Sequence, residues 1–348
     1  MQHFLKPIFV FSRLISAGFF GLWLLVALPA QGAGFWDVRK HDGEDYVSTE
    51  SIKQYPGYKF KTMTRKGNEI TLESPGDKGV VMKLVIGSAE CTMNRVKFVF
   101  CKPVVEINSK AFISCTDLAK LVHPVLTPSF IKNAGNFNTV ILDPGHGGKD
   151  PGATNAYGTE AGYNLLVANL AKAELMKLGF KVVMTRTTDH YLTLEERVNL
   201  ANAVKGEAVF ISIHFNSGGR AARGIETFTL SPPGVAHYGR GVVAADSFLR
   251  AGNEHDSANV ALATATHGMV TRSLEGYTFD RGIKRARYTV LSGVRHPAIL
   301  LEGGFMSHPY ESRLIHKPEY QARVARAVAQ AVKKYQVAVT RRPTAASN

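Results

Sequence analysis

Two histidines and two glutamates stand beside glycine-rich turns in the second half of the chain. His146 and His214 are each followed closely by two consecutive glycines, Glu302 directly precedes a pair, and Glu160 lies between the histidines. Glycine has no side chain, so an ion or a substrate can approach the backbone closely there. Two histidines and one glutamate form a known ligand set for catalytic zinc with the fourth position open to water. The second glutamate would then be free to act on that water.

The elements that must position these residues are buried strands. Three short apolar runs have the length and composition of such strands, and each ends beside one candidate: 139–142 before His146, 208–213 before His214, and 298–301 before Glu302. Ligands of open α/β sheets gather at the carboxyl ends of the strands. Glu160 would begin the helix after the first strand, close to the same edge. The sequence therefore predicts that all four side chains converge.

Each candidate also has an ordinary interpretation. A histidine after a strand is more often a surface or hydrogen-bonded residue than a ligand, and Glu160 could complement a helix N-terminus. Glu302 could be a solvated charge at the end of a strand. The separations are too long for a self-contained metal motif. Spacing alone leaves both interpretations open, and convergence on one sheet edge favours the metal site.

Residues 139–336 alternate between strand and helix patterns. Further strands are predicted at 182–184 and 225–230, and helices at 194–204, 257–274 and 318–335. One apolar helical stripe ends before Gly179 and consists of Tyr163, Leu166, Val167, Leu170, Ala171, Leu175 and Leu178. This alternation predicts an α/β fold, with a mainly parallel sheet covered by helices. Residues 337–348 are predicted to be a loose tail.

Residues 34–126 have a different pattern of short strands, which predicts a separate small α+β module before the α/β domain. Strands are expected at 69–72, 80–86 and 96–100, and a helix at 115–122. Residues 127–138 contain Pro, Asn and Gly and are predicted to be a linker. The stretch 82–126 resembles the copper amine oxidase-like N-terminal domain, and it carries no metal ligands. A targeting or spacing role is the hypothesis for this module.

The first 33 residues have the organisation of a secretory signal peptide. Lys6 and Arg13 precede an apolar run at 14–28 that ends in small residues. An uncleaved membrane anchor is the alternative, but the run is short for a spanning helix and is interrupted by Ser16 and two glycines. We therefore expect an exported protein, in the periplasm or outside the cell, with no stable membrane insertion after cleavage.

The charge of the chain favours an anionic partner. The 348 residues include 42 Lys and Arg against 28 Asp and Glu, a formal charge of +14. The basic residues are scattered and accompany no nucleic-acid-binding motif, so no nucleic-acid partner is predicted. Four cationic residues gather in one run, where they could steer an anionic polymer or form a solvated basic face: Arg281, Lys284, Arg285 and Arg287.

The three cysteines lie in the first half of the chain. Cys91 and Cys101 could bridge a hairpin, and the alternative is that both, with Cys115, are buried thiols. Their spacing matches no zinc motif.

The catalytic half resembles the zinc-dependent N-acetylmuramoyl-L-alanine amidases of the Amidase_3 type. The residues that carry the resemblance are Asp143-Pro144-Gly145-His146-Gly147-Gly148-Lys149-Asp150-Pro151-Gly152-Ala153, Glu160 with Asn164-Leu165, Thr185-Arg186 with Asp189, Arg197 with Ala201-Asn202, Ser212-Ile213-His214-Phe215-Asn216, Arg281-Gly282 and Glu302-Gly303-Gly304-Phe305. The resemblance implies that His146, Glu160 and His214 bind Zn²⁺ and that Glu302 is the catalytic carboxylate. The implied substrate is peptidoglycan, cut between the lactyl group of N-acetylmuramic acid and L-alanine. A non-cleaving wall-binding protein and a zinc peptidase acting within the stem peptide are the alternatives.

Two further roles are hypotheses. Asp143 could orient a ligand histidine through a hydrogen bond, or it could simply form the turn before Pro144. In some relatives an insert after the strand at 225–230 covers the zinc until an activator protein removes it. The corresponding segment here, 231–256, contains His237, Glu254 and His255. It could gate the site, or it could be a plain surface loop.

Overall fold

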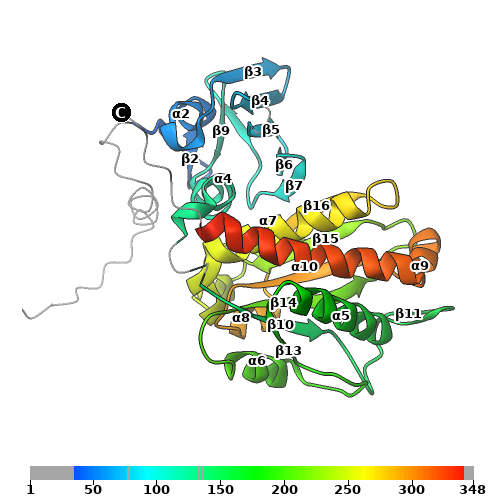
Figure 1. Cartoon of the computed structure of the whole chain (residues 1–348). Helices are drawn as coiled ribbons and strands as arrows, with labels where there is room; N and C mark the ends of the chain where they lie inside the picture. Colours follow the sequence, from blue (N-terminus) through cyan, green and yellow to red (C-terminus); the bar gives the residue numbers. More distant parts are fainter. Residues whose placement is uncertain (1–34, 77–78, 132–133, 135, 341–348) are drawn as a thin grey trace, which may run out of the picture.

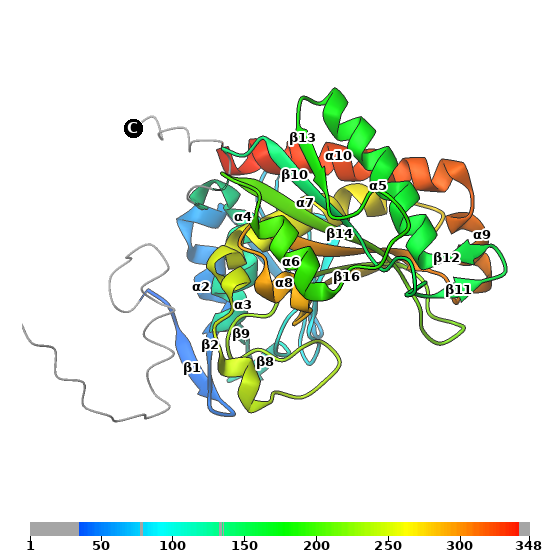
Figure 2. The same cartoon turned by 90° about the horizontal axis from the view of Figure 1, so that it is seen from below.

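The computed structural model describes residues 35–76, 79–131, 134 and 136–340. Within these ranges, eleven strands form one mixed sheet with helices on both faces (Figures 1 and 2). In order across the sheet, the strands are β13 (Lys181–Met184), β10 (Thr139–Pro144), β14 (Ala208–Asn216), β17 (Ala298–Phe305), β15 (Ile225–Leu230), β16 (Asp280–Ala286), β7 (Val96–Val99), β6 (Glu90–Met93), β5 (Val81–Val85), β4 (Glu69–Glu73) and β3 (Thr62–Lys66).

The first four strands of that order are parallel, which brings their carboxyl ends to one edge. β15 is antiparallel to β17 and parallel to β16. The side chains of these strands alternate between the two faces, and both faces are covered. On one face lie α5 (Glu160–Lys177), α7 (Asp256–Ser273) and α10 (Pro318–Thr340), and on the other lie α6 (Leu194–Asn202) and α8 (Thr289–Gly293). The predicted α/β class with helices over a mainly parallel sheet is confirmed for this part of the chain.

Local sequence explains the bounds of the helices that flank the site. Thr193 and Glu196 form a capping box that begins α6. Thr159 caps α5, and Gly179 ends it with φ +87°, a left-handed conformation that favours glycine. The predicted apolar stripe of α5 is only partly correct. Leu166 and Leu170 belong to an exposed apolar outer face of the helix, and not to its core side.

The expected separation between the N-terminal module and the catalytic part is wrong. β7 pairs in parallel with β16, so β3 to β7 continue the catalytic sheet. Asp280 stabilises the junction between β7 and β16. Its carboxylate accepts hydrogen bonds from Lys97 N at 3.0 Å, Gly282 N at 2.7 Å and His267 Nε2 at 2.8 Å. The sequence analysis did not predict β16 as a strand, because its residues are largely charged, although it lies inside the sheet between β15 and β7.

The rest of the N-terminal part forms a second, smaller sheet. The helix predicted at 115–122 is confirmed, because residues 115–122 are helical. Within the described residues this sheet has four strands: β1 (Val38–His41), β2 (Glu44–Ser48), β9 (Lys110–Ser114) and β8 (Val105–Ile107). Short helical turns complete this part: α2 (Thr49–Gln54), η1 (Pro56–Tyr58), α3 (Cys115–Asp117), η2 (Leu118–Val122), α4 (His123–Leu126) and η3 (Pro128–Phe130). Near the catalytic edge are the hairpin β11 (Thr154–Asn155) and β12 (Gly158–Thr159), and also α9 (Pro309–Ile315).

The three cysteines are free thiols in the structure, so the Cys91–Cys101 bridge is not formed. Cys101 Sγ instead lies 3.1 Å from Asp117 Oδ2, as a hydrogen-bond donor. Burial raises the pKa of the Cys91 and Cys101 thiols well above their usual range, which makes both poor nucleophiles.

The predicted signal peptide lies outside the described residues. Of the helices in the described ranges, none is both long enough and apolar enough to cross a bilayer.

The junction between β7 and β16 gives a first prediction. Asp280→Ala should lower the free energy of unfolding by about 2–4 kcal/mol, because donors on β7, α7 and β16 lose a charged acceptor. Urea denaturation measures the effect. The matched control is Glu90→Ala, which removes an exposed carboxylate paired with Lys97 Nζ and should change the value by less than about 1 kcal/mol. Equal effects of the two substitutions would contradict the assigned role of Asp280.

Candidate metal centre and active site

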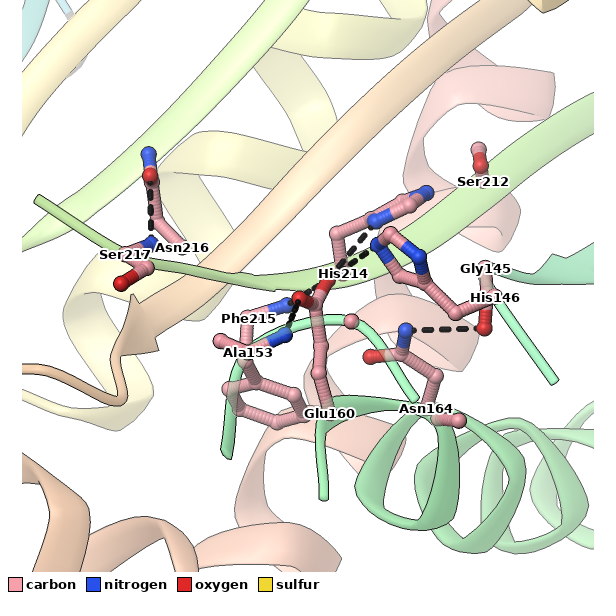
Figure 3. Close-up of polar contacts among 12 residues, drawn as sticks. Gly145, His146, Ala153, Glu160, Asn164, Ser212, His214, Phe215, Asn216 and Ser217 are labelled. Carbon is pink, nitrogen blue, oxygen red and sulfur yellow. Dashed lines mark hydrogen bonds and ion pairs between the residues drawn. The ribbon is translucent and has the colours of Figure 1, made fainter. Parts of the chain in front are cut away.

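The three predicted ligands meet at the carboxyl edge of the sheet (Figure 3). One donor atom each from His146, Glu160 and His214 lies within 4.8 Å of the others. Glu160 Oε1 is 3.2 Å from His146 Nε2 and 2.9 Å from His214 Nδ1. The two imidazoles stand edge to face, with ring centroids 5.0 Å apart. This arrangement of two nitrogen donors and one carboxylate suits a divalent cation.

Separate elements bring the three donors together. His146 follows β10 in a turn where its own φ is +59°, Glu160 is the first residue of α5, and His214 lies near the end of β14. The second oxygen of Glu160 accepts a hydrogen bond from Ala153 N at 2.9 Å. Gly145 packs directly against the ring of His214, and a Cβ at this position would overlap the imidazole. A glycine is therefore required there.

The hypothesis that Asp143 orients a ligand histidine is wrong. Asp143 is buried on β10, where it accepts hydrogen bonds from Thr185 Oγ1 at 2.6 Å, Arg197 Nη1 at 2.8 Å and Ser212 Oγ at 2.8 Å. The residue that contacts His146 Nδ1 is Asp150, at 2.8 Å. The turn after β10 reverses the chain, and so brings Asp150, and not Asp143, beside the imidazole.

Two buried arginines hold the turn that carries His146. Arg197 donates to the carbonyl oxygens of Pro144 at 2.8 Å and His146 at 2.7 Å. Arg186 donates to the carbonyl oxygens of Pro144 and Gly145, at 2.9 Å each. An unpaired buried carbonyl would be costly, so these bonds stabilise the left-handed turn. The family motif contained both arginines, but their contacts became visible only in the structure.

Glu302 lies on β17, directly opposite His214 in the strand register. Its side chain is 9% exposed, and Oε2 has no hydrogen-bond partner among the described residues. Burial raises the pKa of Glu302 well above its usual range, and the charges of Glu160 and Glu226 act in the same direction. Burying a carboxylate without a partner costs free energy, and a catalytic role or a bound ion is a usual explanation for such a group.

Glu302 and the three donors line one cavity of about 620 Å³. Tyr191, from the segment that leads into α6, and Leu194, the first residue of α6, form one wall, and Asn216 lies at the end of β14. Tyr288 and Val290 close another side. The carboxylates of Glu160 and Glu302, two imidazoles and a group of apolar and amide side chains therefore line one open cavity. Such a site can hold a substrate with both polar and apolar parts.

Both interpretations of the basic run are wrong for its buried members. Lys284 is buried and its Nζ lies 2.6 Å from Glu226 Oε1, which Arg281 also contacts. Arg285 is buried and donates to Thr229 Oγ1 at 3.0 Å. Lys284 is thus paired with Glu226 and Arg285 is buried against a hydroxyl group, so these two cations neither steer a polymer nor form a solvated face.

The fourth cation of the run, Arg287, is joined to the predicted gating segment. Its guanidinium donates to Pro232 O at 2.8 Å, and its backbone N–H donates to His237 Nδ1 at 3.0 Å. None of residues 231–256, all of which the structure describes, lines the catalytic cavity. Glu254 and His255 line a different cavity of about 390 Å³. The segment packs beside the active site and does not cover it.

Comparison with known proteins identifies the family. Residues 140–334 match the family model described as N-acetylmuramoyl-L-alanine amidase, and the chain belongs to this family. The chain is 32% identical over 198 residues to the uncharacterized protein YqiI of Bacillus subtilis, covering 57% of this chain and 84% of YqiI. It is 28% identical over 228 residues to the amidase AmiC of Neisseria meningitidis, covering 58% and 53% of the two chains. The probable cell wall amidase LytH of Staphylococcus aureus is 30% identical over 207 residues, with 59% and 60% covered.

The matches thus span little more than half of AmiC and LytH. Among solved structures, the catalytic domain of the amidase CwlV from Bacillus (Paenibacillus) polymyxa is 30% identical, with a TM-score of 0.48 and coverage of 57% of this chain and 98% of that domain. An amidase from Clostridium difficile 630 is 31% identical, with a TM-score of 0.47 and coverage of 57% and 97%.

The contact between Asp150 and His146 gives the second prediction. Asp150→Ala should weaken the binding of a divalent metal ion by about 10–100-fold, because the ring of His146 loses the carboxylate that orients it. Competition with a coloured chelator measures the affinity. Asp189→Ala is the matched control, since Asp189 supports the same turn through Gly148 N at 2.8 Å and contacts no ligand ring in the structure's described part. Similar affinities for the two variants would refute this role of Asp150.

Proposed function

We propose that this protein hydrolyses peptidoglycan at the amide bond between the lactyl group of N-acetylmuramic acid and L-alanine. One observation carries the proposal. The unpartnered carboxylate of Glu302 shares a cavity with the cluster of His146, Glu160 and His214, in a chain that belongs to an amidase family. The residues needed for binding a metal and for moving a proton are therefore present in one place.

Zinc is the metal that this donor set fits best. Two imidazoles and one carboxylate are typical of catalytic zinc, which keeps a position open for water. The three cysteines lie in the N-terminal part, so the cluster itself supplies nitrogen and oxygen donors only. When bound, zinc supplies an activated water and polarises a carbonyl oxygen.

The protein's own residues would then position and move protons. Glu302 takes a proton from the attacking water and returns it to the amine of L-alanine as the bond breaks. Between the two steps the carboxyl group of Glu302 would hold that proton. Asp150 and Arg197 keep His146 in place through the reaction, by hydrogen bonds to its ring and its backbone.

The proposed site of action is outside the cytoplasm, in the periplasm or beyond the cell. The named cell-wall amidase relatives support an extracytoplasmic role. Export through residues 1–33 and a targeting role for the N-terminal strands stay predictions. Any targeting surface would be rigidly joined to the active site, because β7 continues the catalytic sheet.

Identification of the products tests the activity. The protein would be incubated, with and without added Zn²⁺, with a defined disaccharide-peptide, and the products analysed by mass spectrometry. We expect an intact disaccharide and a peptide that begins at L-alanine. A cut within the peptide would instead indicate a zinc peptidase. Binding without any cut would indicate a wall-binding protein.

Glu302→Gln provides the third prediction. This variant should lose at least about 100-fold of its turnover, because the amide cannot accept the proton, while it retains one equivalent of zinc. Turnover and metal content would be measured on the same sample. A near-normal rate in this variant would exclude Glu302 as the proton acceptor.

The fourth prediction separates ligands from other histidines. His214→Ala should lose zinc and activity together, because a donor of the cluster is removed. His41→Ala, which changes a half-buried histidine of β1, should retain both. Metal analysis after gel filtration gives the comparison, and full zinc occupancy in His214→Ala would refute the proposed ligand set.

A further inference from the structure

A short segment beside the active site exposes an unusual number of apolar side chains. We define the apolar lobe as residues 238–250, which include the turn η4 (Ala244–Ser247) and precede η5 (Ala251–His255). The exposed fractions are 57% for Val242, 49% for Val243, 62% for Phe248 and 70% for Leu249. In Figure 2 the segment between β15 and α7, in yellow-green, reaches the lower edge of the molecule. Several exposed apolar side chains within one short segment are typical of an interaction surface.

The lobe is folded around one buried carboxylate. Asp246 accepts hydrogen bonds from Arg240 Nη1 at 2.7 Å, Arg240 Nη2 at 2.8 Å and Val243 N at 2.9 Å. Arg287 Nη2 donates to the carbonyl oxygen of Asp246 at 2.6 Å. The backbone is therefore already ordered, and little conformational entropy remains to be lost when the exposed side chains bind a partner.

The exposed charges of the lobe are positive. Between residues 238 and 250 the charged side chains are Arg240, Arg250 and Asp246, and only the aspartate is buried. The guanidinium of Arg250 lies 6.0 Å from the ring centre of Phe248, so positive and apolar groups share one surface. The whole chain carries a formal charge of +14. This combination complements an anionic surface that has an apolar layer beneath it.

The side-chain types decide among anionic partners. Valine and leucine offer no hydrogen bonds to a sugar polymer, and none of residues 238–250 lines either of the described cavities above. Such a projecting lobe can instead insert its apolar side chains among acyl chains, with the guanidinium of Arg250 at the level of the lipid phosphates. We propose that the apolar lobe docks this protein on an anionic phospholipid bilayer.

Docking would place the catalytic cavity near the bilayer surface. Arg287 connects the lobe to Tyr288 and Thr289, which line that cavity. The proposal goes beyond the amidase activity, and it stands or fails separately, because binding to lipid is measured without any turnover.

Vesicle sedimentation tests the proposal. The chain from residue 34 onward would be used, because it retains every described element and lacks the apolar run 14–28. We expect it to bind vesicles of phosphatidylglycerol mixed with phosphatidylcholine, and to bind pure phosphatidylcholine weakly. Replacing Phe248 and Leu249 together by Ser should weaken binding by about tenfold or more, since two apolar side chains no longer enter the bilayer. Arg250→Glu should weaken binding to the anionic vesicles only.

The matched control replaces Leu166 and Leu170 of α5 together by Ser, because these leucines are also exposed but lie outside the lobe. It should bind as the unmodified chain does. In the variant Phe248→Trp, brominated lipids should quench the fluorescence of the new tryptophan, because residue 248 would lie among the acyl chains. The proposal is overturned if the unmodified chain does not bind the anionic vesicles, or if the lobe and control variants bind equally. It is also overturned if the lobe instead joins two copies, seen as a dimer in ultracentrifugation that the Phe248 and Leu249 double variant abolishes.

Discussion

The carboxylate of Glu160, placed between two imidazoles, is the interaction on which the site depends. Its Oε1 lies 2.9 Å from His214 Nδ1 and 3.2 Å from His146 Nε2, and its Oε2 accepts from Ala153 N. Burial acts to raise the pKa of Glu160, but the histidines and this backbone donor outweigh it and lower the pKa. The carboxylate therefore remains charged inside the protein. A carboxylate and two imidazole nitrogens held together in this way can bind a divalent cation.

The sheet and two arginines maintain that geometry. Parallel pairing of β10, β14 and β17 brings their carboxyl ends to the same edge, with His214 and Glu302 opposite each other. Arg186 and Arg197 then satisfy the carbonyl oxygens of the turn that carries His146. Asp143 balances the charge of Arg197 below that turn. Asp143, which the sequence analysis considered as a partner of a ligand histidine, thus lies beneath the turn, where it accepts hydrogen bonds from Arg197 and from Ser212 of the neighbouring strand.

The sequence predicted those features whose signal is local. Apolar runs buried on both faces predicted β10, β14 and β17, and Thr193 with Glu196 predicted the start of α6. Features that depend on distant partners were missed. β16 has a cationic sequence, and its burial depends on Glu226 and Thr229, more than fifty residues away. The choice of Asp150 over Asp143 depends on the left-handed turn at His146, which the sequence pattern does not specify.

The central claim is that His146, Glu160 and His214 bind a metal ion, and identifying the atoms that coordinate the bound ion tests it most directly. X-ray absorption spectroscopy of the zinc-loaded protein reports the number and type of donor atoms around the ion. The account predicts two imidazole nitrogens at about 2.0–2.1 Å, carboxylate or water oxygens at similar distances, and no sulfur. A sulfur scatterer at about 2.3 Å, or a shell with fewer than two imidazoles, would contradict a site formed by His146, Glu160 and His214.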